Sequence, residues 1–62
     1  MKNLKFYHKA AGLTQQQLAD LLGVKRNVVT MWELGHNMTP AKYLLQLAEI
    51  LGCTVEDLLR PA

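Results

Sequence analysis

The sequence predicts an all-α fold of five short helices, and the placing of glycine and the spacing of apolar residues carry this prediction. All four glycines follow a stretch in which apolar residues recur at helical spacing, and a glycine just after a helix favours the left-handed conformation that ends it. No segment needs to form a strand. We expect helices at about residues 2–11, 15–22, 26–34, 40–51 and 55–60.

Polar residues mark where these helices begin. Threonine stands just before three of them, at positions 14, 39 and 54, where its hydroxyl can accept a hydrogen bond from an unpaired backbone N–H. Gln17 and Asp57, each three residues further on, predict capping boxes with Thr14 and Thr54. Pro40 suits the first position of the fourth helix. That helix is rich in apolar residues, with Leu45 widening its apolar face, and we expect it at the centre of the fold.

The second and third helices predict a helix-turn-helix over about residues 14–34. Their apolar faces consist of Leu18, Ala19 and Leu22 before the corner and Val29 and Trp32 after it. Two such faces can be buried only against each other. Ala19 is small enough for the helices to cross closely, and Gly23 can take the positive φ that reverses the chain.

The third helix then presents outward side chains suited to base edges. Arg26 suits guanine, Asn27 suits adenine, and Val28, apolar on a face that we expect to be wet, suits a thymine methyl group. Thr30 and Met31 follow one turn later. We expect these five residues to read DNA bases.

The segment from Gly12-Leu13-Thr14-Gln15 to Trp32-Glu33-Leu34-Gly35 resembles the phage-repressor-like (Cro/Xre-type) helix-turn-helix family. The resemblance continues to Leu51-Gly52-Cys53-Thr54 and Leu58-Leu59, and so covers nearly the entire chain. It implies one lambda-repressor-like domain over residues 1–62 that binds double-stranded DNA.

The candidate phosphate contacts are Gln15, Gln16, Lys25, His36, Asn37 and Lys42. Gln15 matches the family residue that holds a backbone phosphate. Lys25 stands at an N-cap without an acceptor oxygen, and it places a cation at the positive end of the helix dipole. A phosphate there would remove the conflict, whereas an ordinary surface lysine is the alternative. The family often has lysine or arginine in the loop at His36 and Asn37, so we expect a moderate salt dependence.

His8 is a second departure from the family. Relatives usually have an arginine there, which pairs with the glutamate of the Trp-Glu element, here Glu33. The resemblance therefore implies a weaker, titratable pair of His8 with Glu33. The alternative is a neutral histidine that is hydrogen-bonded to a backbone group.

Charge and composition narrow the function. Residues 1–32 carry five basic side chains and one acidic, a balance of +4, against −2 for residues 33–62. A polyanion is the natural partner of the basic half, and the alternative is a solvated basic face that includes Lys5. The single cysteine excludes an internal disulfide, and the first residues lack a signal-peptide core, so we expect a cytoplasmic protein. No apolar run approaches the roughly 20 residues that span a bilayer.

We expect no metal and no cofactor, because the separations of His8, His36 and Cys53 match no zinc pattern. An enzyme is disfavoured, since the sequence has no serine and no phosphate-cradling glycine loop.

The function that we expect is sequence-specific regulation of transcription, with repression implied by the resemblance. One helix-turn-helix reads too few base pairs, so we expect a homodimer on a palindromic operator. Val55, Leu58 and Leu59 are the candidate dimer contacts. The alternative is a protein-interaction module of the same fold, such as an antitoxin-like subunit that holds a protein partner and binds DNA secondarily.

Overall fold

The computed structural model describes residues 1–60, so the last two residues of the predicted domain lie outside the described part. Its five α-helices are α1 (Lys2–Ala10), α2 (Gln15–Leu22), α3 (Arg26–Leu34), α4 (Ala41–Leu51) and α5 (Val55–Leu59). Residues 1–60 contain no strand. The all-α prediction is confirmed, and each predicted helix boundary lies within one residue of the observed one.

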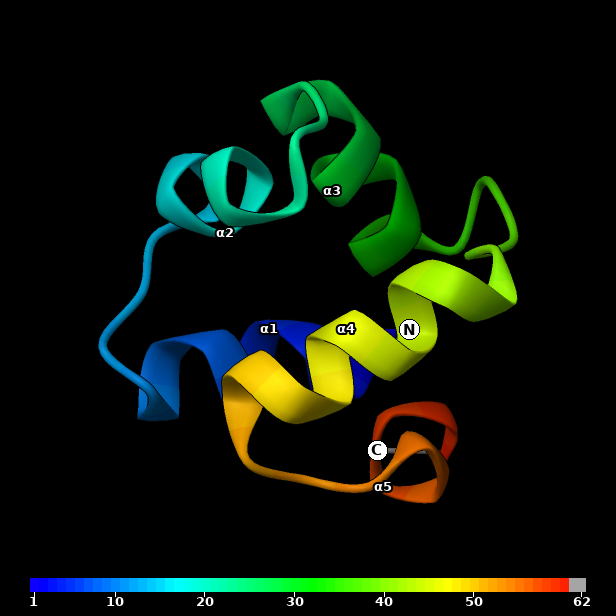
Figure 1. Ribbon diagram of the computed structural model, residues 1–62. Helices are drawn as coiled ribbons and strands as arrows, with labels where there is room; N and C mark the ends of the chain where they lie inside the picture. The colour runs from blue at the N-terminus through cyan, green and yellow to red at the C-terminus, as the bar shows by residue number, and fades with distance from the viewer. Residues whose placement is uncertain (61–62) are drawn as a thin grey trace.

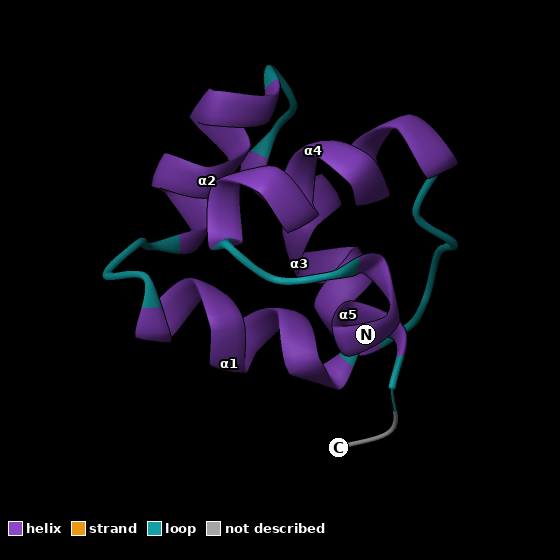
Figure 2. Ribbon diagram, turned by 60° about the horizontal axis from the view of Figure 1, so that its bottom comes forward, coloured by secondary structure: helices purple, strands orange, loops and turns teal. Residues whose placement is uncertain are grey.

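The helices are arranged around one core (Figure 1). In that view α2 and α3 lie at the top, α1 and α4 cross below them, and α5 lies at the bottom. Helix α1 packs against both α3 and α5, and α4 packs against α5. The view in Figure 2, turned about the horizontal axis, shows α1 running along one side of the molecule beside α5. Helix α1 therefore connects the helix-turn-helix to the C-terminal end of the fold.

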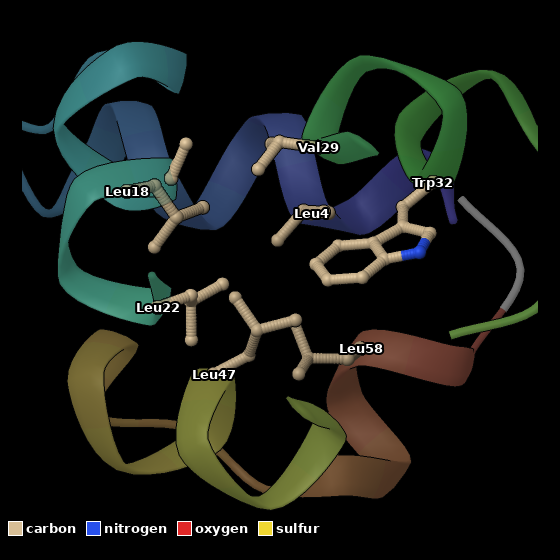
Figure 3. Close-up of a cluster of buried hydrophobic side chains, with 8 residues drawn as sticks. Leu4, Leu18, Leu22, Val29, Trp32, Leu47 and Leu58 are labelled. Atoms are coloured by element: carbon tan, nitrogen blue, oxygen red, sulfur yellow. The ribbon is translucent and has the colours of Figure 1, made fainter. Parts of the chain in front are cut away.

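Every helix contributes to the core (Figure 3). The buried apolar residues are Leu4, Leu18, Ala19, Leu22, Val29, Trp32, Leu47 and Leu58. This list contains both apolar faces predicted for the helix-turn-helix. Truncation of any one of the buried leucines to alanine should cost about 2–5 kcal/mol, which is a large part of the stability of a small domain.

The corner between α2 and α3 has the backbone that its sequence predicts. Gly23 adopts φ 73° and ψ 28°, and the next N–H, that of Val24, donates to the Ala19 carbonyl at 3.0 Å. A Cβ added at Gly23 would meet no atom within 4 Å. Glycine is therefore favoured at this position by its backbone conformation and not by a lack of space. Other residues are destabilised by about 1–2 kcal/mol in the left-handed region.

The capping predictions are confirmed at two helices and wrong at a third. Thr14 and Thr54 both form complete capping boxes, with Gln17 and Asp57 respectively. At α4, however, Pro40 is itself the N-cap, and no side chain caps this helix. Pro40 keeps an extended ψ of 147°, and its carbonyl accepts the Leu44 N–H at 3.1 Å. The helix therefore starts one residue later than predicted.

The apolar face of α4 is also narrower than predicted. Leu47 is fully buried, whereas Leu45 is 62% exposed. Ile50 and Leu51 are partly buried and pack against the core. Leu45 lies two residues from Leu47, and two residues turn an α-helix by more than half a circle, so the two leucines cannot share one face.

Candidate nucleic-acid interface

One face of helix α3 packs into the core, and the opposite face is exposed to solvent. Val29 and Trp32 fix it in the core. Arg26, Asn27 and Met31 are exposed on the opposite side. A helix held in this way presents its remaining side chains on a rigid support.

Thr30 and Val28 lie between these two sides. Val28 is half-buried and packs against the core cluster. Packing therefore accounts for part of its apolar character, and its contact with a thymine methyl group stays a prediction. Thr30 is half-buried as well, but its hydroxyl makes polar contacts at the edge of the exposed side.

The start of α3 lacks the side-chain cap that α2 has. Lys25 is the N-cap, with φ −78° and ψ 150°, and its side chain makes no capping hydrogen bond. The Lys25 carbonyl accepts the Val28 N–H at 2.9 Å. Lys25, Arg26 and Asn27 are all exposed, so two cations stand beside a helix N-terminus whose dipole attracts anions.

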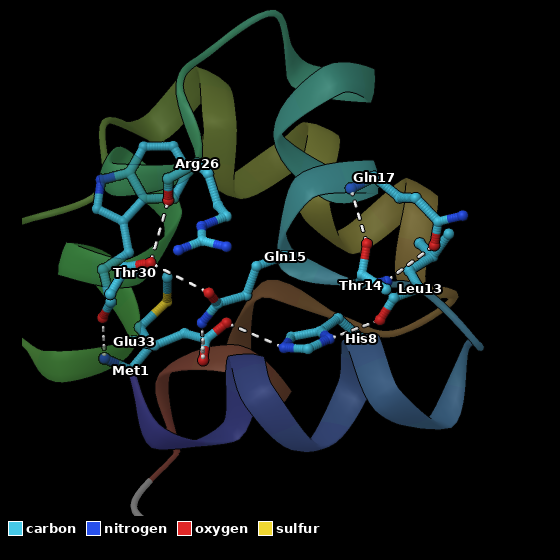
Figure 4. A network of polar contacts seen from close by, with 10 residues as sticks. Met1, His8, Leu13, Thr14, Gln15, Gln17, Arg26, Thr30 and Glu33 are labelled. Carbon is cyan, nitrogen blue, oxygen red and sulfur yellow. Dashed lines mark hydrogen bonds and ion pairs between the residues drawn. The ribbon is translucent and has the colours of Figure 1, made fainter.

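The start of α2 is tied to α3 by a side-chain hydrogen bond. The Thr30 hydroxyl lies 3.1 Å from Gln15 Oε1 and 3.2 Å from the Arg26 carbonyl, and its hydrogen can be donated to either oxygen. Figure 4 shows Gln15 between Thr30 and Glu33. The structure thus brings the predicted phosphate contact Gln15 next to the predicted base contact Thr30.

The same network continues to His8. Gln15 Nε2 donates to Glu33 Oε1 at 3.1 Å, and Glu33 Oε2 lies 3.0 Å from His8 Nε2, with the two side chains only 7% and 5% exposed. Neither of these two atoms has a hydrogen-bond partner within the described residues, so their contact is a close approach and not a hydrogen bond. His8 Nδ1 lies 2.8 Å from the Leu13 carbonyl oxygen. The family resemblance implied the contact of His8 with Glu33, and the alternative, a backbone partner for His8, is met by the Leu13 carbonyl. Nothing in the sequence indicated the contact of Glu33 with Gln15.

The remaining candidate phosphate contacts are spread more widely. Gln16 is exposed and donates to Asp20 Oδ1 at 2.9 Å. His36, Asn37 and Lys42 are also exposed, but His36 and Asn37 follow the C-terminal end of α3 and Lys42 lies in the first turn of α4. These three therefore do not join the group around the start of α3.

Lys5 was expected on a solvated face of the first helix, with a phosphate contact as the alternative. It lines a hollow of about 270 Å³ together with Gln15, Thr30, Glu33 and Leu34. The available signal was its position three residues before His8, which puts both on neighbouring parts of one helix surface. Lys5 thus adds a cation near Gln15.

The predicted dimer contacts separate into different environments. Leu58 is fully buried in the core, so it cannot contact a second chain, and this part of the prediction is wrong. Val55 is half-buried, whereas Leu59 is 57% exposed and Met38 is 94% exposed. An apolar hollow of about 280 Å³ is lined by Met1, Asn37, Met38, Thr39, Leu44 and Leu59.

Two ionisable groups near α5 have pKa values shifted from their ordinary ones. The pKa of Asp57 is lowered by its hydrogen bonds with the Thr54 backbone and side chain. The pKa of the Cys53 thiol is raised by burial and by the negative charge of Asp57. Cys53 is therefore a protonated, half-buried side chain that packs against the core.

Within residues 1–60 there is no helix long and apolar enough to cross a membrane.

These observations define the class of protein. Two helices meet at a left-handed glycine, the first is capped, and the second is held by buried residues with its N-terminal side chains exposed. This is the geometry of a helix-turn-helix protein. A family model described as helix-turn-helix matches residues 4–58, and the chain belongs to this family, in its Cro/C1 type.

The chain is also similar to three curated proteins. It is 39% identical over 59 residues to YqaE, an uncharacterized HTH-type transcriptional regulator of Bacillus subtilis, covering 95% of this chain and 51% of that protein. It is 37% identical to MJ0272, an uncharacterized HTH-type transcriptional regulator of Methanocaldococcus jannaschii, covering 94% of this chain and 89% of that protein.

The third relative is YonR, an SPbeta prophage-derived uncharacterized HTH-type transcriptional regulator of Bacillus subtilis. The identity is 34%, over 95% of this chain and 55% of YonR. The chain therefore spans about half the length of both Bacillus relatives. No solved structure matches it.

Proposed function

We propose that this protein is a sequence-specific, double-stranded DNA-binding regulator of transcription that inserts α3 into the major groove and represses its target. The observation that carries the proposal is the uncapped start of α3, where Lys25, Arg26 and Asn27 are exposed on a helix held by Val29 and Trp32. The relatives named as transcriptional regulators support it, while repression rests on the family resemblance.

The side chains divide into two roles. Arg26 and Asn27, in the first turn of α3, read base edges, because arginine and asparagine make bidentate hydrogen bonds with guanine and adenine. Lys25 and Gln15 bind backbone phosphates on either side of the groove, which fixes the register but carries no sequence information. Met31, at 40% exposure, supplies an apolar contact one turn later.

The protein acts as a homodimer on a palindromic site. A stable interface buries about 800 Å² on each partner, which is a substantial part of the 4163 Å² accessible surface of this chain. The surface that we assign to the dimer is the apolar hollow around Met38, Leu44 and Leu59, extended by Val55, which lies four residues before Leu59 on α5. Analytical ultracentrifugation at micromolar concentration, with and without duplex DNA, tests this assignment.

Selection of bound duplexes from a random pool, at a fixed salt concentration, tests the function. We expect an enriched palindrome whose half-sites lie about one helical turn apart. Enrichment of no sequence, together with a monomer that captures a protein partner through the Met38 surface, would instead support the protein-interaction module.

A further inference from the structure

The hydroxyl group of Thr30 is engaged within the protein itself. It lies 3.1 Å from Gln15 Oε1, on the neighbouring helix α2, and 3.2 Å from the Arg26 carbonyl oxygen. The Arg26 carbonyl already belongs to the backbone hydrogen-bond ladder of α3, so Gln15 is the acceptor that needs the hydroxyl hydrogen. Because a hydroxyl has one hydrogen, donation to Gln15 leaves none for a base edge.

The side-chain amide of Gln15 is held at both ends. Its oxygen accepts from Thr30 at 3.1 Å, and its nitrogen donates to Glu33 Oε1 at 3.1 Å. Figure 4 shows Gln15 between these two side chains of α3. The Glu33 side chain is only 7% exposed, so the amide has a partner that is itself fixed by packing. A glutamine held in this way has lost much of its rotamer freedom before any ligand arrives.

The amide of Gln15 still has a hydrogen to offer to a ligand. An amide nitrogen carries two hydrogens, and the bond to Glu33 uses one of them. Gln15 also lines a hollow with Lys5, whose exposed side chain brings a positive charge to the side of the Glu33 carboxylate. An anion such as a backbone phosphate therefore meets an oriented N–H donor and a cation at this hollow.

We propose that Thr30 is a positioning residue for Gln15 and does not read a base. This inference rests on the proposed function, in which Gln15 binds a backbone phosphate. Thr30 and Glu33 order the amide when the protein folds, so that it need not be ordered when DNA binds. Because phosphate contacts fix the register of the protein without reading sequence, the contribution of Thr30 is the same for every duplex.

The test is affinity for the selected duplex and for each of its single-base variants, measured by fluorescence anisotropy. Thr30→Val removes the hydroxyl and keeps the β-branched shape of the side chain. We expect it to weaken binding about threefold to tenfold for all of these duplexes alike, which is the effect of one long side chain that must be ordered on binding. Thr30→Ser is the matched control, since it keeps the hydroxyl, and it should retain the wild-type affinity.

Gln15→Ala provides a double-mutant cycle with Thr30→Val. If Thr30 acts through Gln15, the two losses are not additive, and Thr30→Val should have no further effect in a Gln15→Ala protein. The slope of affinity against salt concentration should be the same in Thr30→Val and the wild type, because a neutral amide that contacts a phosphate releases no counterion.

The outcomes separate the inference from the proposed function. A changed preference at one base pair in Thr30→Val, a loss that adds fully to that of Gln15→Ala, or no loss at all overturns the inference and leaves DNA binding intact. Absence of sequence-specific binding by the wild type overturns both. Circular dichroism establishes that each variant is folded. If Thr30→Val does not fold, Thr30→Ala, which also lacks the hydroxyl, takes its place and is judged by the same outcomes.

Discussion

The N-termini of α2 and α3, the two helices of the helix-turn-helix, differ in their capping. At α2, Thr14 accepts the Gln17 N–H at 3.0 Å and the Gln17 side chain accepts the Thr14 N–H at 2.9 Å. At α3, Lys25 stands in the capping position and caps nothing. The N-terminus of α2 is capped by side chains of the chain itself, whereas the N-terminus of α3 has no side-chain cap. The preference for a capping side chain at a helix N-terminus is met at α2, and it is not met at α3, where we place the DNA contacts.

The largest effect that this comparison predicts is on DNA binding at α3. Arg26→Ala should weaken binding to the selected duplex by about 1–3 kcal/mol and relax the preference at one base pair. Arg60→Ala is the matched control, since it removes an exposed cation at the C-cap of α5, outside the helix-turn-helix. Anisotropy against the consensus and its single-base variants measures both. Equal losses for the two variants would mean that Arg26 acts only through net charge.

The next effect is on stability at α2. Thr14→Ala removes the capping box and should lower the free energy of unfolding by about 1 kcal/mol. Chemical denaturation followed by circular dichroism measures the change. Thr39→Ala is the control, because Thr39 caps no helix, and it should have a smaller effect. A Thr14→Ala protein as stable as the wild type would contradict the contrast between the two helix starts.

A third substitution gives α3 a capping side chain like the one at the start of α2. Lys25→Ser supplies the missing acceptor oxygen, and we expect a gain in stability of about 0.5–1 kcal/mol. DNA affinity should fall for all sequences alike, because a phosphate contact is lost. Denaturation and anisotropy on the same preparation reveal the two opposite changes. A variant that gains stability and keeps its affinity would remove Lys25 from the interface.

The smallest effect concerns the other complete capping box, at α5. Because the folded pKa of Asp57 is lowered from its ordinary value of 3.8 by hydrogen bonds with Thr54, its ionised form stabilises the folded state. That contribution is present above the unfolded value and is lost as the pH falls through the lowered one. Melting temperatures of the wild type and Asp57→Asn should therefore converge on acidification. A constant difference across this range would show that the charge of Asp57 has no role.

Much of the fold was predictable because it depends on contacts over three or four residues. The capping boxes at Thr14 and Thr54 and the left-handed corner at Gly23 are local, and all three were correct. Pro40 was misplaced because a proline suits both the cap and the position after it. In the candidate site, the proximity of His8 to Glu33 came from the family resemblance, not from any pattern in the residues.

The sequence by itself determined which segments are helices and where each one turns, since a hydroxyl, an amide or a glycine acts on its own backbone. Only the tertiary structure decided which apolar side chains are covered: Val28 packs while Met31 stays exposed, and Leu58 is buried while its neighbour Leu59 is not. It also decided that Gln15 lies between Thr30 and Glu33. These outcomes depend on the angles at which separate helices cross, and residues distant in the chain fix those angles together.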